Sequence, residues 1–202
     1  MFTQNAGRFD EACGGLCEKV AFVLYAVPQT IKQQVCQIRL RVDMPVILSL
    51  PEDMLFLQKN GQVSHQITPD TLIMTQPLLL ECFRALCSYS IHRHEEDIKI
   101  GFLTVVGGHR AGICGTAVLD EKGIHTLCDI SSITLRIARQ IPQAGQELFD
   151  VLFSNKLCSV LLAGAPMSGK TTILRDLARR LANGQNGRYC QTAVIDERGE
   201  LA

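Results

Sequence analysis

Gly164-Ala165-Pro166-Met167-Ser168-Gly169-Lys170-Thr171 decides the fold, because it matches the phosphate-loop pattern Gly-x4-Gly-Lys-Thr. A short apolar run, 158–163, precedes it and a helix-forming stretch, 172–182, follows it. This context predicts a buried strand, a loop and a helix in that order, as a phosphate loop requires. We therefore predict nucleotide binding and set aside the alternative of an unrelated glycine-rich turn before a helix.

Each part of the loop has a predicted role toward ATP and Mg²⁺. Glycines let the backbone bend so that amide groups point at the phosphates, and the helix N-terminus adds its dipole. Lys170 is expected to reach the β- and γ-phosphates as a catalytic residue, and the Thr171 hydroxyl to bind Mg²⁺. The predicted ATP-binding residues here are Gly164, Ala165, Pro166, Met167, Ser168, Gly169, Lys170, Thr171 and Thr172.

A second apolar run, 192–195, ends in the carboxylates Asp196 and Glu197. Only 26 positions separate Lys170 from Asp196, which leaves no room for the strand and helix that usually precede a Walker B strand. We predict instead a second strand of the nucleotide domain, whose carboxyl end faces the nucleotide. Glu197 is then the candidate to activate water, with Asp196 as a further Mg²⁺ ligand; pairing of these acids with Arg198 is the alternative.

Upstream of the loop, the pattern predicts a separate α+β domain of helices followed by antiparallel strands. Helices are expected over 9–26, from Pro28 to 35, from a start at 68–70, after Pro77 to 88, and over 92–100. Strands are expected at 37–41, 46–50, 54–57, 102–106, 110–119 and 133–139. A last helix is expected over 146–154.

The predicted architecture is therefore α/β in two domains. Residues 1–143 form the N-terminal α+β domain, and residues 144–202 begin a P-loop ATPase domain of the RecA-like type with parallel strands. Because the chain ends five residues after Glu197, we expect this second domain to be truncated, with the Walker B aspartate, sensor residues and arginine finger lying beyond residue 202.

Composition restricts the partners. Twenty basic and twenty acidic residues give a net charge of zero, which argues against nucleic acid as a partner. The nine cysteines are odd in number and several lie in apolar runs, and no apolar run approaches the ~20 residues of a membrane span, so we expect a reduced, cytoplasmic protein. Cys82, Cys87, His92 and His94 suggest zinc, but their spacing fits no common zinc module.

Several segments together resemble the stage III sporulation protein AA family of endospore-forming bacteria, a secretion-type branch of the RecA-like ATPases. The most specific is Gly107-Gly108-His109-Arg110-Ala111-Gly112-Ile113-Cys114-Gly115. The others are Gln37-Ile38-Arg39-Leu40-Arg41, the stretches 87–90, 101–104 and 130–139, the phosphate loop, and 194–200. The resemblance extends over nearly all of the chain from about residue 16.

This resemblance implies an ATPase of the mother cell that acts with membrane proteins of a secretion-like channel into the forespore. It implies a ring, a hexamer, at the inner face of the membrane. In such ATPases arginines of the N-terminal domain lean over the nucleotide, and Arg110, Arg136 and Arg139 match those positions; solvated strand arginines are the alternative. A nucleic-acid-handling RecA-like ATPase, or a fragment that binds nucleotide without hydrolysing it, are the competing functions.

Overall fold

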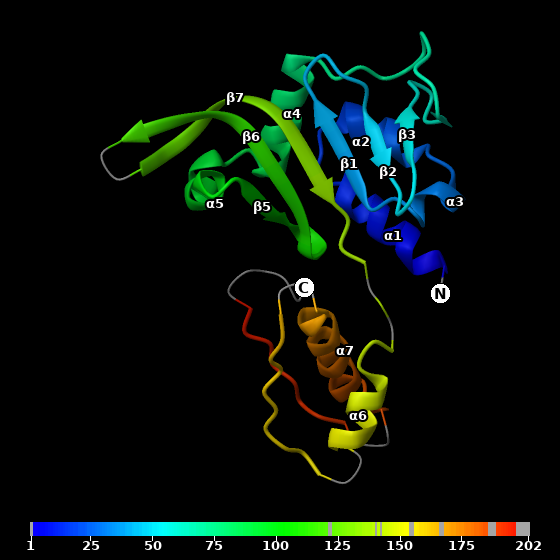
Figure 1. Ribbon diagram of the computed structural model, residues 1–202, viewed down its shortest axis with the longest axis vertical. Coiled ribbons are helices and arrows are strands. Elements are labelled where there is room, and N and C mark those ends of the chain that lie inside the picture. Colours follow the sequence, from blue (N-terminus) through cyan, green and yellow to red (C-terminus); the bar gives the residue numbers. More distant parts are fainter. Residues whose placement is uncertain are drawn as a thin grey trace. The chain divides into compact units, whose positions relative to one another are not determined.

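The computed structural model describes residues 2–120, 123–139, 141, 143–153, 156–165, 168–185 and 189–196. The chain divides into two compact units, residues 1–139 and 140–202, and each is described by itself. The first unit is a mixed α/β unit with an antiparallel sheet, and the second holds the phosphate loop (Figure 1).

A seven-stranded sheet forms the first unit, with the strand order β4-β3-β2-β1-β7-β6-β5 and every pair antiparallel. Alternating burial along the strands, such as Ile38 and Leu40 buried with Arg39 and Arg41 exposed on β1, is what a half-covered sheet requires. The strands are β1 (Gln37–Arg41), β2 (Ile47–Ser49), β3 (Met54–Leu57), β4 (Val63–Ser64), β5 (Phe102–Val105), β6 (His109–Asp120) and β7 (Gly123–Arg136).

Helices cover one side of this sheet, as Figure 1 shows for α1, α2 and α4. Their apolar side chains form one buried cluster with the inward strand residues, for example Phe9, Leu24 and Leu79 with Ile38 and Leu135. Burial of this cluster supplies the main stabilising free energy of the unit. The helices are α1 (Phe2–Cys13), α2 (Glu18–Tyr25), α3 (Gln29–Lys32), α4 (Gln76–Leu86) and α5 (Glu95–Lys99), with short 3₁₀ turns at Ile91–His94 and Val106–Gly108.

The opposite side of the sheet, which we call the open face, is presented by the alternate strand residues. These residues lie in three rows across the strands, fixed by the register of the pairs. The rows are Thr104-Arg110-Arg136-Gln37-Ser49, Phe102-Gly112-Thr134-Arg39-Ile47-Phe56 and Cys114-Ser132-Arg41.

Three expectations for this unit are wrong. The single helix over 9–26 is two helices, because the chain turns at Gly14-Gly15, where the Gly15 amide bonds to the Ala12 carbonyl instead of continuing the helix. No helix begins at 68–70: Thr71 bridges Gln58, and the segment pairs with the sheet edge. The last strand begins at Gly123, not at 133, because it pairs with β6 along most of its length.

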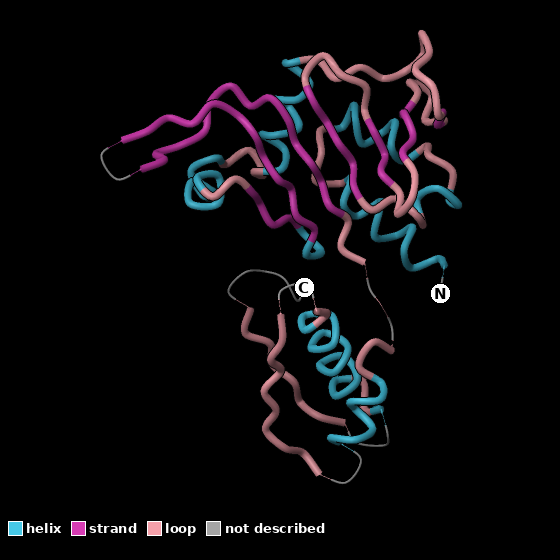
Figure 2. Tube along the Cα trace, viewed as in Figure 1, coloured by secondary structure: helices cyan, strands magenta, loops and turns pink. Residues whose placement is uncertain are grey.

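The described part of the second unit contains the helices α6 (Gln146–Phe153) and α7 (Lys170–Ala182), which agree with the helices expected at 146–154 and 172–182. The predicted strands at 158–163 and 192–196 are extended segments that join no hydrogen-bonded sheet within the described part of this unit. Figure 2 accordingly draws them as loops. The packed residues are Phe149, Phe153 and Leu177, with Leu148, Leu152, Leu162, Ile173 and Leu181 against them.

A buried polar cluster in the first unit binds the backbone of Ala138, one residue before the unit ends at residue 139. The Ala138 amide donates to Nδ1 of His109 at 3.0 Å, and the Ala138 carbonyl accepts from Nε of Arg8 at 3.1 Å. Since an amide must donate, Nδ1 is unprotonated and the His109 proton sits on Nε2, 3.5 Å from Oε2 of Glu11. Burial, together with the Arg8 guanidinium, lowers the pKa of His109, which keeps the ring neutral at pH 7.

Gly107 makes this cluster possible. Its φ of +82° is a left-handed conformation, and an added Cβ would lie 2.6 Å from the Glu11 carboxyl carbon, which Arg8 holds in place. Gly107→Ala should therefore destabilise the first unit by about 1–3 kcal/mol, measured by chemical unfolding. The matched control is Gly7→Ala in α1, where nothing lies within 4 Å of the new Cβ; equal losses in the two variants would contradict the account.

Candidate nucleotide-binding site

The phosphate loop leads directly into the N-terminus of α7. Gly169 precedes the helix with a φ of +88°, which only glycine adopts without strain, and its carbonyl accepts from the Ile173 amide at 2.9 Å. The first-turn amides of a helix have no partners within the helix, so those of Lys170, Thr171 and Thr172 are donors for an anion. The loop therefore ends in the arrangement that binds phosphate in other proteins.

Lys170 folds back over the loop. Its Nζ donates to the carbonyl of Gly164 at 2.8 Å and to that of Ala165 at 2.6 Å. The ammonium group thus lies against Gly164 and Ala165, the first two residues of the loop. Pro166 and Met167 lie outside the described residues, whereas Ser168 is exposed and Thr171 and Thr172 are half-buried.

A buried ion cluster fixes α7 behind the loop, and the sequence reasoning missed it. Asp176 is 3% exposed; its Oδ2 accepts from Nε of Arg180 at 2.7 Å and from the Gly145 amide at 3.0 Å, while Oδ1 accepts from Arg179. Burial raises the pKa of Asp176, but hydrogen bonds from Arg180, Arg179 and Gly145 outweigh it and lower the pKa to about 2. The carboxylate therefore stays ionised and ties α7 to the residue just before α6.

The other predicted site residues lie in different places. Asp196 ends the second extended segment and is half-buried, and Glu197 lies outside the described residues. In the first unit, Arg110 on β6 and Arg136 on β7 are direct cross-strand partners. Arg139 follows β7, and its guanidinium donates to the Val35 carbonyl at 2.9 Å.

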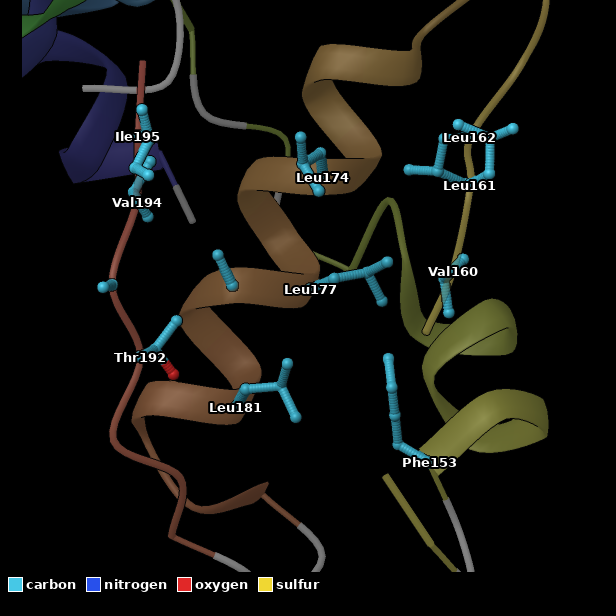
Figure 3. A pocket seen from close by; sticks show the side chains of 12 residues that line it. Phe153, Val160, Leu161, Leu162, Leu174, Leu177, Leu181, Thr192, Val194 and Ile195 are labelled. Atoms are coloured by element: carbon cyan, nitrogen blue, oxygen red, sulfur yellow. The ribbon is translucent and has the colours of Figure 1, made fainter. Parts of the chain in front are cut away.

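An apolar hollow of about 480 Å³ lies along one side of α7, between the two extended segments (Figure 3). Leu174, Leu177 and Leu181 line it from the helix, Val160 from one segment and Val194 from the other. None of the loop residues lines this hollow, so it is a feature of packing, separate from the phosphate site. Leu161 and Ile195 on its rim are 90% and 94% exposed.

Among the described residues no three histidine, cysteine or acidic side chains come together as a metal site, and Cys82, Cys87, His92 and His94 do not form one. The nine cysteines are all free thiols. Within the same residues, no helix has the length and apolar character needed to cross a membrane.

The family model described as "Sporulation stage III, protein AA" matches residues 17–202. The chain belongs to this family. The match begins at the turn between α1 and α2 and extends over the sheet, the Gly107-Gly108-His109 cluster and the phosphate loop.

A curated family member is similar over most of this chain. Stage III sporulation protein AA of Bacillus subtilis (strain 168) is 32% identical over 188 residues, which are 93% of this chain and 57% of the relative. The chain thus spans little more than half the length of that relative. Among solved structures, the ATPase DotB of Legionella pneumophila aligns over 78% of this chain and 40% of its own, with a TM-score of 0.46 and 15% identity.

Proposed function

We propose that this chain binds Mg·ATP through residues 164–172 as part of an ATPase motor that acts in endospore formation. The observation that carries the proposal is the position of the Lys170 ammonium, which is bonded to the carbonyls of Gly164 and Ala165 where the loop begins, while the loop ends at the N-terminus of α7. When phosphates occupy the loop, Lys170 exchanges its two carbonyl partners for β- and γ-phosphate oxygens, and the loop amides take up the remaining charge. Membership of the sporulation family supports the cellular setting.

Mg²⁺ would be held by the Thr171 hydroxyl, with Asp196 as a second oxygen ligand, and hard oxygen donors of this kind suit that ion. Glu197 is proposed to orient the attacking water. Hydrolysis is likewise a proposal, since this chain spans 57% of the length of its curated relative.

The apolar hollow supports the proposal that the second unit is part of a RecA-like parallel sheet. Segments 158–163 and 192–196 lie on either side of α7 with their apolar side chains exposed, which is costly for Leu161 and Ile195 unless further strands pack there.

Arg110 and Arg136 are proposed to act on the nucleotide, together with Arg139. The register places Arg110 and Arg136 directly opposite each other on neighbouring strands, so one anion could contact both guanidinium groups. The γ-phosphate of a nucleotide is such an anion.

We propose further that the chain forms a hexameric ring. The ring is located in the cytoplasm at the inner face of the membrane, with membrane proteins of the sporulation channel as partners.

The test is equilibrium dialysis of the chain with ATP, ADP and AMP in the presence of Mg²⁺. ATP and ADP should each bind at one site per chain and compete with one another, whereas AMP should not compete, because it lacks the β-phosphate that the loop and Lys170 hold. Equal binding of AMP, or no retention of ATP, would overturn the proposal. Phosphate release measured in parallel separates an ATPase from a chain that only binds nucleotide.

A further inference from the structure

The open face of the sheet carries a basic patch that the neutral composition conceals. Arg39, Arg41, Arg110 and Arg136 lie in its three rows, and no acidic residue occupies any position of these rows. Arg39, Arg41 and Arg136 are exposed and form no ion pair with any residue that the structure describes. The acidic residues that balance the chain's charge lie elsewhere, so the charges are segregated on one face.

These arginines are spread too widely for one small anion. Arg136 lies opposite Gln37 and Arg41 lies opposite Ser132, so the two rows are four residues apart along the strands, which is about 13 Å. A single nucleotide carries its phosphates in one cluster and would engage one row only. A polymer with a charge on every unit matches the whole spread.

Aromatic rings lie among the arginines. Phe102 and Phe56 share the row of Arg39, and the Arg110 guanidinium stacks 4.2 Å from the Phe102 ring centroid. Unpaired bases stack on aromatic rings and on guanidinium planes, whereas the carboxylates of an acidic peptide do not stack on aromatic rings. A membrane surface would favour large exposed apolar side chains, but both rings are half-buried at the level of the sheet.

We propose that the open face binds single-stranded nucleic acid, with Arg39, Arg41 and Arg136 on the phosphates and the Phe102–Arg110 stack beneath a base. The side of the antiparallel sheet opposite α1, α2 and α4 gives an extended strand room to lie across several rows. This binding does not use the phosphate loop, but it uses Arg110 and Arg136, the two arginines also proposed above to act on the nucleotide, so oligonucleotide binding is measured without ATP.

The experiment is fluorescence anisotropy of a labelled 12-nucleotide oligouridylate with the whole chain at 50 and 200 mM salt. With three phosphate contacts, the logarithm of the binding constant should fall with the logarithm of the salt concentration with a slope of about −2. The affinity should therefore be about 20-fold lower at 200 mM than at 50 mM salt. Arg39→Glu/Arg41→Glu should weaken binding by at least tenfold, whereas Lys19→Glu/Arg93→Glu, which changes the net charge equally at exposed helical sites, should not.

Lys170→Ala should leave oligonucleotide binding unchanged, so failure here and failure of ATP binding are distinguishable. Melting temperatures of the variants, and the milder pair Arg39→Gln/Arg41→Gln, separate lost contacts from lost folding. No binding at 50 mM salt, or an equal loss in the Lys19/Arg93 control, would overturn the proposal. Binding to anionic phospholipid vesicles or to polyglutamate in place of the oligonucleotide, lost in the Arg39/Arg41 variant, would overturn it in favour of that other partner.

Discussion

Replacing Lys170 with alanine is expected to weaken ATP binding by about ten- to a hundredfold. The ammonium group lies against Gly164 and Ala165 at the start of the loop and should form charge-assisted hydrogen bonds to the β- and γ-phosphates. Each such bond contributes about 1.5–3 kcal/mol, and 1.4 kcal/mol is a factor of ten in affinity. Calorimetric titration with Mg·ATP measures the effect, with ADP as a second ligand to separate the β- from the γ-contact.

Lys156→Ala is the matched control, since it removes an exposed lysine from the same unit outside the loop. Its ATP affinity should equal that of the unchanged chain. Lys170 also braces the carbonyls of Gly164 and Ala165, so the melting temperature of each variant should be recorded. An unchanged ATP affinity in a folded Lys170→Ala chain would contradict the proposed role of the loop.

The second large effect is expected at Asp176, with a loss of about 3–5 kcal/mol in the unfolding free energy of the second unit for Asp176→Ala. Removing one partner of a buried ion pair leaves the other charge without compensation, and Arg180 is as buried as Asp176. Urea unfolding followed by circular dichroism measures this loss. Glu147→Gln, an exposed acid in α6, should change stability by less than about 1 kcal/mol.

The same cluster makes the second unit sensitive to acid. Because the folded pKa of Asp176, about 2, lies below its ordinary value, the carboxylate stabilises the fold above pH 4, and this stabilisation is lost as the pH falls toward 2. The loss is about 2–3 kcal/mol when complete. The Asp176→Ala chain should not lose this part of its unfolding free energy between pH 4 and pH 2. An equal loss in both chains over this pH range would show that Asp176 does not cause it.

Much of the fold could be predicted where local pattern and tertiary environment agree. The alternation of Gln37-Ile38-Arg39-Leu40-Arg41 predicted β1, because one face of the sheet is covered and the other is not. The helix after the phosphate loop was predicted from its loop and its apolar spacing. The segment 68–75 was predicted wrongly, because a threonine before a proline resembles a helix start until its pairing with distant Gln58 and Pro45 is known.

The site was predictable in part for a similar reason. The phosphate-loop pattern is contiguous, so the sequence alone predicts its residues, and their role remains a proposal. The Asp176 cluster was missed although Asp176, Arg179 and Arg180 have the i, i+3 and i+4 spacing of helical ion pairs, because spacing does not reveal burial or the contact with Gly145. The basic patch of the open face was also missed, because the net charge of the chain does not show that these arginines share one side of a sheet.

The most direct test of the central claim is a heteronuclear NMR titration of the chain with Mg·ATP. The largest amide shifts are expected within residues 164–172, because these amides donate to the phosphates, and Lys170→Ala should need about ten- to a hundredfold more ATP to reach the same shifts. Shifts confined to residues outside this loop, or none at saturating ATP, would contradict it.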